Sequence, residues 1–232
     1  MLADSASTKE DLQRVWNIPE AKISVVYSGV SPHFHPVTGK NILRDTLQKY
    51  NLGEKPYVLS VGTLQPRKNY EMLIRAFKLV SEKVSHNLVI VGGKGWMYEQ
   101  IQDEIKQQNL SNRVRLLGYA DDSDLPALYS GAALFVFPSL YEGFGIPLLE
   151  AMACGVPVIS SNGSSLPEVT GESSILLPPD DQAGWSREII DLLEDTDRRT
   201  KMVASGFLQA RHFSWKESAR TVTKIYHTLL SS

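Results

Sequence analysis

The sequence predicts an α/β protein built on a doubly wound parallel sheet, a Rossmann-like arrangement of three layers. Short apolar runs alternate with amphipathic stretches through the middle of the chain, and this alternation of strand and helix signals is typical of that fold class. The runs are almost wholly apolar, which indicates parallel strands covered on both faces. The expected strands are Tyr57–Val61, 88–91, 114–117, Leu134–Phe137 and 156–160, with 175–177 as a sixth candidate.

Helices fit the intervals between these strands. Asn69 suits the N-cap of a helix whose apolar residues share one face, namely Met72, Leu73, Ala76, Phe77 and Val80. Pro147 suits the first turn of a helix and Gly155 suits the position after its end, so a short helix is predicted over 147–154. Further helices are predicted over 96–108, over 122–129 and through most of the chain after Asp181.

The first 36 residues are predicted to be separate from this sheet. A possible helix at 8–16 and a candidate strand at 23–27 are followed by glycine and proline residues that break the pattern. Because one helix and one strand cannot form a core, we interpret residues 1–36 as the end of a preceding domain or as an extension packed on this one. The domain proper is expected over residues 37–232.

Composition narrows the class of protein. The 232 residues, 42% of them hydrophobic, suffice for one large domain or for one domain and a fragment. A net charge of −2 argues against electrostatic binding to nucleic acid. The single cysteine, Cys154, fits a reducing compartment. No signal peptide is visible and the apolar runs are too short to span a bilayer, so a cytoplasmic location is expected.

The loop after the first predicted strand holds two cations. Because ligands of open parallel sheets bind at the carboxyl ends of the strands, this loop is a candidate site. Arg67 and Lys68 directly precede the predicted helix, where free N–H groups and the helix dipole favour an anion such as a diphosphate. The alternative is a solvated basic turn. Gly62 and Thr63 belong to the same loop.

The loop after the second predicted strand is rich in glycine and contains Gly93 and Lys94. Glycine allows a backbone to approach a ligand closely, although turns between strands and helices also need glycine for geometry. The loop is neither a P-loop nor the dinucleotide fingerprint, which would follow the first strand. A nicotinamide-dependent dehydrogenase is therefore disfavoured.

The loop after the fourth predicted strand carries most of the candidate residues. Glu142 lies in a glycine-containing loop, and Glu150 lies about one turn into the next helix. A carboxylate can accept two hydrogen bonds from a cis diol, so Glu150 suits a ribose and Glu142 suits sugar hydroxyls. Gly143 and Gly145 leave backbone N–H groups available. The alternative interpretation gives neither acid a ligand. Glu142 would then be a loop acid, and Glu150 would be a first-turn acid favoured by the helix dipole.

This segment resembles a known family. The run Phe-Pro-Ser-Leu-Tyr-Glu-Gly-Phe-Gly-Ile-Pro-Leu-Leu-Glu-Ala-Met-Ala-Cys-Gly-Val-Pro-Val-Ile within residues 132–161 resembles the E-x7-E signature of glycosyltransferase family 4. Members of that family are retaining enzymes with the two-domain GT-B architecture. Residues 27–36 resemble the interdomain hinge, and Gly118, Tyr119 and residues 125–129 also fit. The resemblance extends over residues 20–215.

The resemblance implies a role for each site residue. Lys68 would contact the donor diphosphate, Glu142 would be the catalytic residue against the transferred sugar, and Glu150 would hold the ribose. Many members carry an arginine where this chain has Thr63, and Arg67 is the candidate substitute. The remaining donor-binding residues implied are Gly62, Thr63, Gly93, Lys94, Gly118, Tyr119, Gly143, Phe144, Gly145, Ile146 and Pro147.

The resemblance also implies transfer without a metal and without a cofactor. That fits a site in which cations and helix N-termini would neutralise the leaving diphosphate, with no cluster of His and Cys ligands. His33 and His35 flank a proline-rich turn and are interpreted as surface residues.

Length is a second departure from the family pattern. A GT-B enzyme has two Rossmann-like domains, whereas this sequence predicts one. The acceptor-binding N-terminal domain is therefore an expected partner, in the same gene or in a separate chain, and it could contact a membrane peripherally. The predicted helix around Trp215–Leu230 resembles the segment that crosses back onto that domain.

The donor is expected to be a nucleotide sugar. The loop from Leu64 to Asn69 and the pair Gly95-Trp96 resemble bacterial mannosyltransferases that build cell-surface polysaccharide. This favours GDP-mannose, with UDP-glucose second, and transfer of the hexose to a saccharide or lipid-linked acceptor. A binding module that holds a nucleotide sugar without catalysis remains an alternative.

Overall fold

The computed structural model describes residues 1–96 and 98–231, and its central feature in those ranges is a parallel sheet of six strands. The strand order is β5-β4-β3-β6-β7-β8, so the chain reverses its direction of travel across the sheet between β3 and β6. Such a switch point opens a crevice at the carboxyl ends of the two strands. The strands are β3 (Tyr57–Val61), β4 (Asn87–Val91), β5 (Val114–Gly118), β6 (Leu134–Phe137), β7 (Val158–Ser161) and β8 (Ser174–Leu177).

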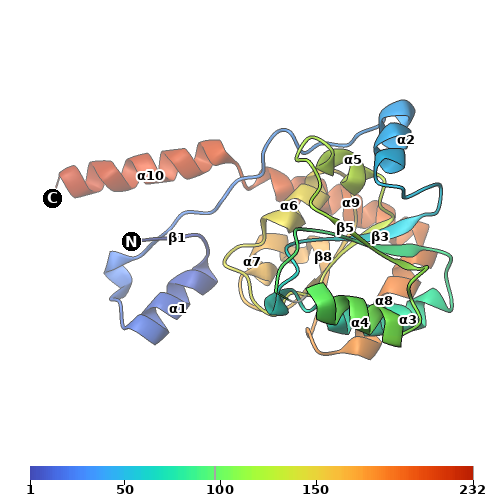
Figure 1. Ribbon diagram of the computed structural model, residues 1–232. Helices are drawn as coiled ribbons and strands as arrows, with labels where there is room; N and C mark the ends of the chain where they lie inside the picture. Colours follow the sequence, from blue (N-terminus) through green and yellow to red (C-terminus); the bar gives the residue numbers. More distant parts are fainter. Residues whose placement is uncertain (97, 232) are drawn as a thin grey trace.

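Helices cover both faces of the sheet (Figure 1). One face packs against α3 (Tyr70–Ser81), α4 (Tyr98–Gln107) and α8 (Gln182–Glu194). The other packs against α6 (Ile146–Ala153) and α9 (Thr196–Arg211), with α5 (Leu125–Ser130) and α2 (Lys40–Lys49) beside them. The short helix α7 (Leu166–Thr170) and the 3₁₀ turns Pro66–Lys68 and Gly171–Ser173 complete this sheet domain, residues 37–214.

The strands explain why the apolar runs are continuous. Leu134 and Val136 of β6 join the core beneath α3 and α8, whereas Phe135 and Phe137 join the core on the opposite face. Successive side chains of a strand point to opposite faces, and both faces are covered here. The prediction of a doubly wound parallel sheet is therefore confirmed.

Two outer segments, residues 1–28 and 215–231, lie outside these layers (Figure 1). They contain β1 (Leu2–Ala3), α1 (Ala6–Trp16), the 3₁₀ turn Glu20–Lys22, β2 (Ser24–Val25) and α10 (Trp215–Leu230). Neither α1 nor α10 has a buried residue. Apolar side chains of α10 such as Leu229 and Leu230 are exposed, whereas Ile23 is 5% exposed and buried.

Some local expectations were wrong or incomplete. Asn69 occupies the position before α3 in a left-handed conformation, and its side chain makes no capping hydrogen bond. Its amide donates instead to the carbonyl oxygens of Pro138 and Pro179, so a tertiary contact replaces the cap. The helices α2 and α7 were not predicted. The helix predicted over 96–108 is observed at Tyr98–Gln107, and Met97 lies outside the described residues.

None of the helices in the described ranges combines the length and apolar character needed to cross a membrane.

Candidate functional site

The loops after β3 and β6 meet at the switch point of the sheet. The first loop ends in the 3₁₀ turn Pro66–Lys68. The backbone N–H of Leu140 in the second loop donates to the carbonyl of Arg67 at 2.7 Å, and the Asn69 amide reaches Pro138 at 3.2 Å. These backbone and amide contacts fix the position of one loop against the other.

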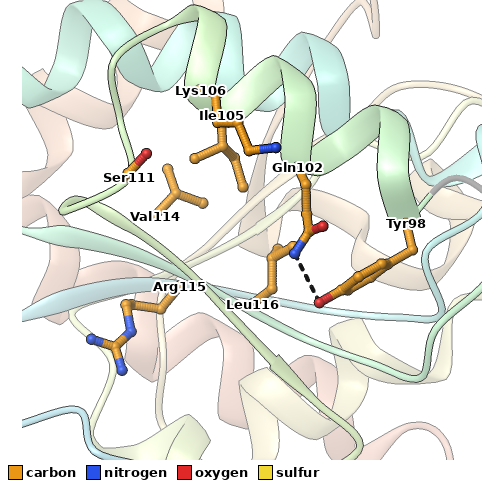
Figure 2. Close-up of a pocket in the computed structure, with 8 residues that line it drawn as sticks. All are labelled: Tyr98, Gln102, Ile105, Lys106, Ser111, Val114, Arg115 and Leu116. Carbon is orange, nitrogen blue, oxygen red and sulfur yellow. Dashed lines mark hydrogen bonds between the residues drawn. The ribbon is translucent and has the colours of Figure 1, made fainter.

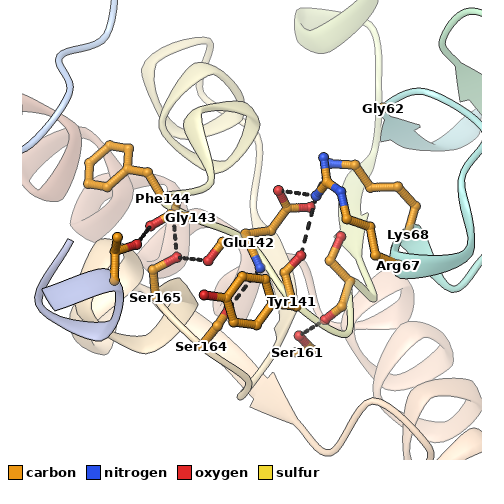
Figure 3. Close-up of polar contacts among 12 residues, drawn as sticks. Gly62, Arg67, Lys68, Tyr141, Glu142, Gly143, Phe144, Ser161, Ser164 and Ser165 are labelled. Carbon is orange, nitrogen blue, oxygen red and sulfur yellow. Dashed lines mark hydrogen bonds and ion pairs between the residues drawn. The ribbon is translucent and has the colours of Figure 1, made fainter. Parts of the chain in front are cut away.

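A cation pair and a carboxylate form the centre of the site (Figure 3). Lys68 Nζ lies 2.6 Å from Glu142 Oε1, and Arg67 Nη1 lies 2.5 Å from Glu142 Oε2. Lys68 is 5% exposed and Glu142 is 8% exposed. The Lys68 ammonium also lies 4.6 Å from the centre of the Phe137 ring. One carboxylate thus serves two cations, and the cluster carries a net charge of +1.

Burial controls the electrostatics of Lys68. Removal from water lowers the pKa of its ammonium, and the Glu142 carboxylate opposes that shift. A buried charge is tolerated when it is paired and hydrogen-bonded. Lys68 therefore depends on an anionic partner within reach, and an anionic ligand could supply the same compensation.

The start of α6 adds hydrogen-bond donors beside this cluster. Gly145 precedes the helix with a φ of 106°, and a Cβ there would lie 2.8 Å from Leu166 Cδ2. The backbone N–H groups of Gly143, Phe144 and Gly145 donate to no partner among residues 1–96 and 98–231. Ile146 and Pro147 form the first turn. Open N–H groups at a helix start can bind phosphate or hydroxyl oxygens.

Glu150 lies further along α6 and is partly buried. The hydroxyl of Tyr129 donates to Glu150 Oε2 at 2.8 Å. Burial raises the pKa of the Glu150 carboxyl, and the Tyr129 hydrogen bond opposes that shift. The first turn of α6 contains no acidic residue, so the alternative interpretation of Glu150 as a first-turn acid is wrong.

The glycine residues that follow β3 and β4, and Gly118 at the end of β5, lie along the same edge of the sheet. Gly92 N–H donates to Gly118 at 2.8 Å, and Leu64 N–H donates to Gly93 at 3.2 Å. A Cβ on Gly92 would lie only 2.0 Å from the carbonyl oxygen of Gly62. The close approach that glycine allows here is between neighbouring loops of the protein itself.

Other predicted residues lie apart from the cluster. The side chains of Thr63, Lys94 and Tyr119 are exposed. The Lys94 ammonium lies over the ring of Tyr98, 4.6 Å from its centre. His33 is also exposed, as predicted, like His35. The structure therefore joins Arg67, Lys68 and Glu142 directly, and the binding and catalytic roles of all the predicted residues stay predictions.

A separate pocket of about 300 Å³ lies between α4 and the edge strand β5 (Figure 2). Its polar lining residues are Tyr98, Gln102, Lys106, Ser111 and Arg115. None of the residues predicted to bind the donor lines this pocket. It belongs to the sheet edge and not to the switch point.

Sequence reasoning missed several residues that support the site. Ser164 and Ser165 contact the backbone around Glu142, and Tyr129 contacts Glu150. A signal for the serines was present, because they follow β7 at the carboxyl edge of the sheet where polar loops merit attention. Their partner residues could not be read from the sequence.

Comparison with known proteins identifies the family. Residues 44–209 match the family profile described as Glycosyl transferases group 1. The chain belongs to this family. It is 36% identical over 231 residues to the O-antigen chain mannosyltransferase B of Escherichia coli, covering 99% of this chain and 60% of that protein. It is 33% identical over 201 residues to the O-antigen chain mannosyltransferase RfbU of Salmonella typhimurium, covering 86% and 53%.

Solved structures agree with this assignment and show one half of a GT-B fold. Sucrose-phosphate synthase from Thermosynechococcus elongatus superposes with a TM-score of 0.84 at 28% identity, covering 99% of this chain and 58% of that one. Anabaena HepE in complex with UDP and glucose superposes with a TM-score of 0.85 at 22% identity, covering 100% and 62%. This member of the group 1 glycosyltransferases therefore spans about three-fifths of the length of these relatives.

Proposed function

We propose that this chain is the donor-binding half of a retaining glycosyltransferase that moves a hexose from a nucleotide sugar to a saccharide or lipid-linked acceptor. The observation that carries the proposal is the cluster of Arg67, Lys68 and Glu142 at the switch point of the sheet. Ligands of open α/β sheets bind at this place. The family of the chain is one of glycosyltransferases.

The cluster suits a diphosphate beside a sugar. Its net charge of +1 attracts an anion, and the open N–H groups of Gly143 and Gly145 add neutral donors at the start of α6. When a diphosphate approaches Lys68 and Arg67, it can replace Glu142 as their anionic partner. The Glu142 carboxylate is then available to accept hydrogen bonds from the hydroxyls of the sugar.

The same groups would assist transfer. As the acceptor hydroxyl oxygen bonds to the anomeric carbon, the bond from that carbon to the diphosphate oxygen breaks. Negative charge accumulates on the departing diphosphate, which can take up the hydroxyl proton. Lys68 and Arg67 are in place before this charge develops, and prearranged charges of this kind lower the barrier of such a step. We propose that transfer needs no metal for this reason. Glu150, hydrogen-bonded to Tyr129 at 2.8 Å, is assigned to the ribose.

GDP-mannose is the favoured donor, with UDP-glucose second. The support for mannose comes from relatives whose names are O-antigen chain mannosyltransferases. The support for UDP-glucose comes from the structural likeness to HepE, which was solved with UDP and glucose. Polysaccharide or glycoconjugate synthesis is the process that we assign to the chain.

An acceptor-binding domain is the proposed partner, in the same polypeptide or in a second chain. Positioning of an acceptor hydroxyl against the anomeric carbon supplies a large share of the rate, and closure of two domains would exclude water from the cleft. Peripheral membrane contact is assigned to that domain, and a cytoplasmic location stays a prediction. The present chain alone is expected to bind donor and to transfer negligibly.

Calorimetric titration tests the proposal. The chain is titrated with GDP, GDP-mannose, UDP and UDP-glucose in the presence of EDTA, and binding of a nucleotide sugar without divalent metal is the expected result. Transfer of radiolabelled hexose is then measured with and without the acceptor domain. Binding that requires a metal would contradict metal independence, and efficient transfer by the chain alone would contradict the half-enzyme assignment.

A further inference from the structure

Two serines in the loop after β7 hold the loop that carries Glu142 (Figure 3). Ser164 Oγ accepts a hydrogen bond from the backbone N–H of Glu142 at 2.9 Å. Ser165 Oγ lies 3.0 Å from the carbonyl oxygen of Glu142 and 2.9 Å from that of Phe144, so its hydroxyl donates to this pair of acceptors. The peptide groups on both sides of Glu142 are therefore fastened to another loop.

The two serines are built into their positions. Ser165 is 0% exposed, and its hydroxyl does not cap α7, although it occupies the N-cap position of that helix. Ser164 has a φ of 48°, a left-handed conformation that costs free energy for a residue other than glycine. The buried hydroxyl of Ser165 connects two loops, and Ser164 adopts an uncommon backbone conformation. Both features indicate that this serine pair has a specific structural role.

That role concerns the direction of the Glu142 side chain. The Glu142 carboxylate lies between Lys68 and Arg67, at 2.6 and 2.5 Å. A diphosphate that binds these two cations therefore breaks the ion pairs that hold the carboxylate. The backbone contacts to Ser164 and Ser165 involve neither cation. They can keep Glu142 in place after its ionic partners have turned to the diphosphate.

We propose that Ser164 and Ser165 are positioning residues that keep Glu142 directed at the donor sugar while Lys68 and Arg67 engage the diphosphate. This inference rests on the proposed function and assigns the serine pair to recognition of the donor sugar. It predicts that the pair contributes to the affinity for a nucleotide sugar but little to the affinity for the bare nucleotide.

The test measures the ratio of GDP-mannose affinity to GDP affinity by calorimetry, for wild type and variants. Ser165→Ala is expected to reduce the ratio about tenfold, in line with a lost buried hydrogen bond, and to change GDP affinity less than about twofold. In a Glu142→Gln background, Ser165→Ala is expected to produce no further reduction, because the serine acts through that carboxylate. Measurements with UDP and UDP-glucose run in parallel.

Ser186 offers a matched control. It is 4% exposed, and its Oγ lies 3.0 Å from the Ala76 carbonyl and 2.8 Å from that of Gln182, in the packing of α8 on α3. Ser186→Ala, like Ser165→Ala, removes a buried serine hydroxyl that contacts two carbonyl oxygens, but it does so far from Glu142, and the affinity ratio should not change.

Ser164→Gly gives a second variant that preserves the fold, because glycine adopts a left-handed conformation easily. It should lower the affinity ratio in the same direction as Ser165→Ala. A ratio that stays at the wild-type value in both variants would overturn this inference alone. A ratio reduced as much by Ser186→Ala would also overturn it. A wild-type chain that prefers no nucleotide sugar over its nucleotide would overturn the proposed function as well.

Discussion

The sheet domain and the outer segments use apolar residues in opposite ways. In the sheet domain, Trp185 of α8 is buried in the core on one face of the sheet, and Phe135 and Phe137 of β6 are buried in the core on the other face. In the outer segments, Trp16 of α1 is 74% exposed and Leu230 of α10 is 86% exposed. The sheet domain covers its own core, whereas the outer helices present apolar side chains that this chain does not cover.

The two regions meet through aromatic and polar contacts beside the proposed donor site. The ring of Tyr27 lies 5.9 Å from that of Phe144 and 5.6 Å from that of Phe213, centre to centre. Glu168 of α7 accepts hydrogen bonds from the N–H groups of Ala6 and Ser7 at 3.0 and 3.2 Å. Thr8 donates to the carbonyl of Gly143 at 3.2 Å. The outer helix α1 is thus attached to the loop that carries Glu142, and a change in its position reaches that loop directly.

Two tryptophan substitutions, one in each region, are expected to differ most in their effect on the free energy of unfolding. Trp185→Ala should lower the free energy of unfolding by about 3–5 kcal/mol, because it removes a fully buried aromatic side chain. Trp16→Ala should change it by less than about 0.5 kcal/mol, since most of that side chain is already in water. Urea unfolding of both variants measures the difference. A large loss from Trp16→Ala would mean that α1 belongs to the cooperative core.

Within the sheet domain, the next effect concerns the two cations. Lys68→Ala should reduce nucleotide diphosphate affinity about ten- to a hundredfold, the range for a charge-assisted contact of about 1.5–3 kcal/mol. Arg67→Ala should reduce it less, because that side chain is 45% exposed, compared with 7% for Lys68. Calorimetry measures both. Lys78→Ala serves as the control, since Lys78 lies in the last turn of α3 and pairs with Glu82 just beyond the end of that helix. Unchanged affinity in Lys68→Ala would disprove the phosphate assignment.

A smaller effect concerns the attachment of α1. Glu168→Gln removes the negative charge that the first N–H groups of α1 face, and an anion at a helix start stabilises the helix by up to about 1 kcal/mol. Hydrogen exchange in the first turn of α1 should become up to about fivefold faster, while exchange in α9 stays the same. Glu172→Gln, an exposed neighbour, is the control. Equal exchange in both variants would show that Glu168 does not secure α1.

The smallest effect concerns the partly buried charge of Glu150. Burial raises its pKa above the ordinary 4.5, so ionisation costs folding free energy, and stability falls as the pH rises through the raised pKa. Glu150→Gln removes this loss while an amide oxygen remains for Tyr129. The variant should be slightly more stable than wild type near neutral pH, and the advantage should disappear below pH 4.5. Urea unfolding at both pH values tests this, and a variant that is less stable at neutral pH would contradict it.

The sheet could be predicted because its signal is local. Each strand of the domain is a nearly continuous apolar run, and β3 and β6 begin and end where the sequence pattern places them. The helix α2 was not predicted because its residues are largely polar and none is buried. The helix α7 has five residues, too few to show a helical period.

The residues of the site could be predicted from the sequence, but the contacts between them could not. Glu142 and Lys68 were chosen from loop position and from family resemblance, and the structure brings them to 2.6 Å. The direct pairing could not be foreseen, because it depends on which two strands flank the switch point. The contacts of Ser165 and the tertiary role of Asn69 likewise join segments distant in the sequence.

The outer segments connect to the sheet domain through two chain crossings that lie side by side. Val30 N–H donates to the carbonyl of Phe213 at 3.1 Å, and a Cβ on Gly29 would lie 2.1 Å from the backbone nitrogen of Trp215. A domain joined to its neighbour by one flexible chain segment can rotate in any direction. A domain joined by two adjacent segments cannot twist unless those segments separate. We therefore expect the paired crossings, together with the hydrogen bonds of α1 to Glu168 and Gly143, to prevent the outer segments from twisting against the sheet domain, and Gly29 allows the two crossings to lie this close.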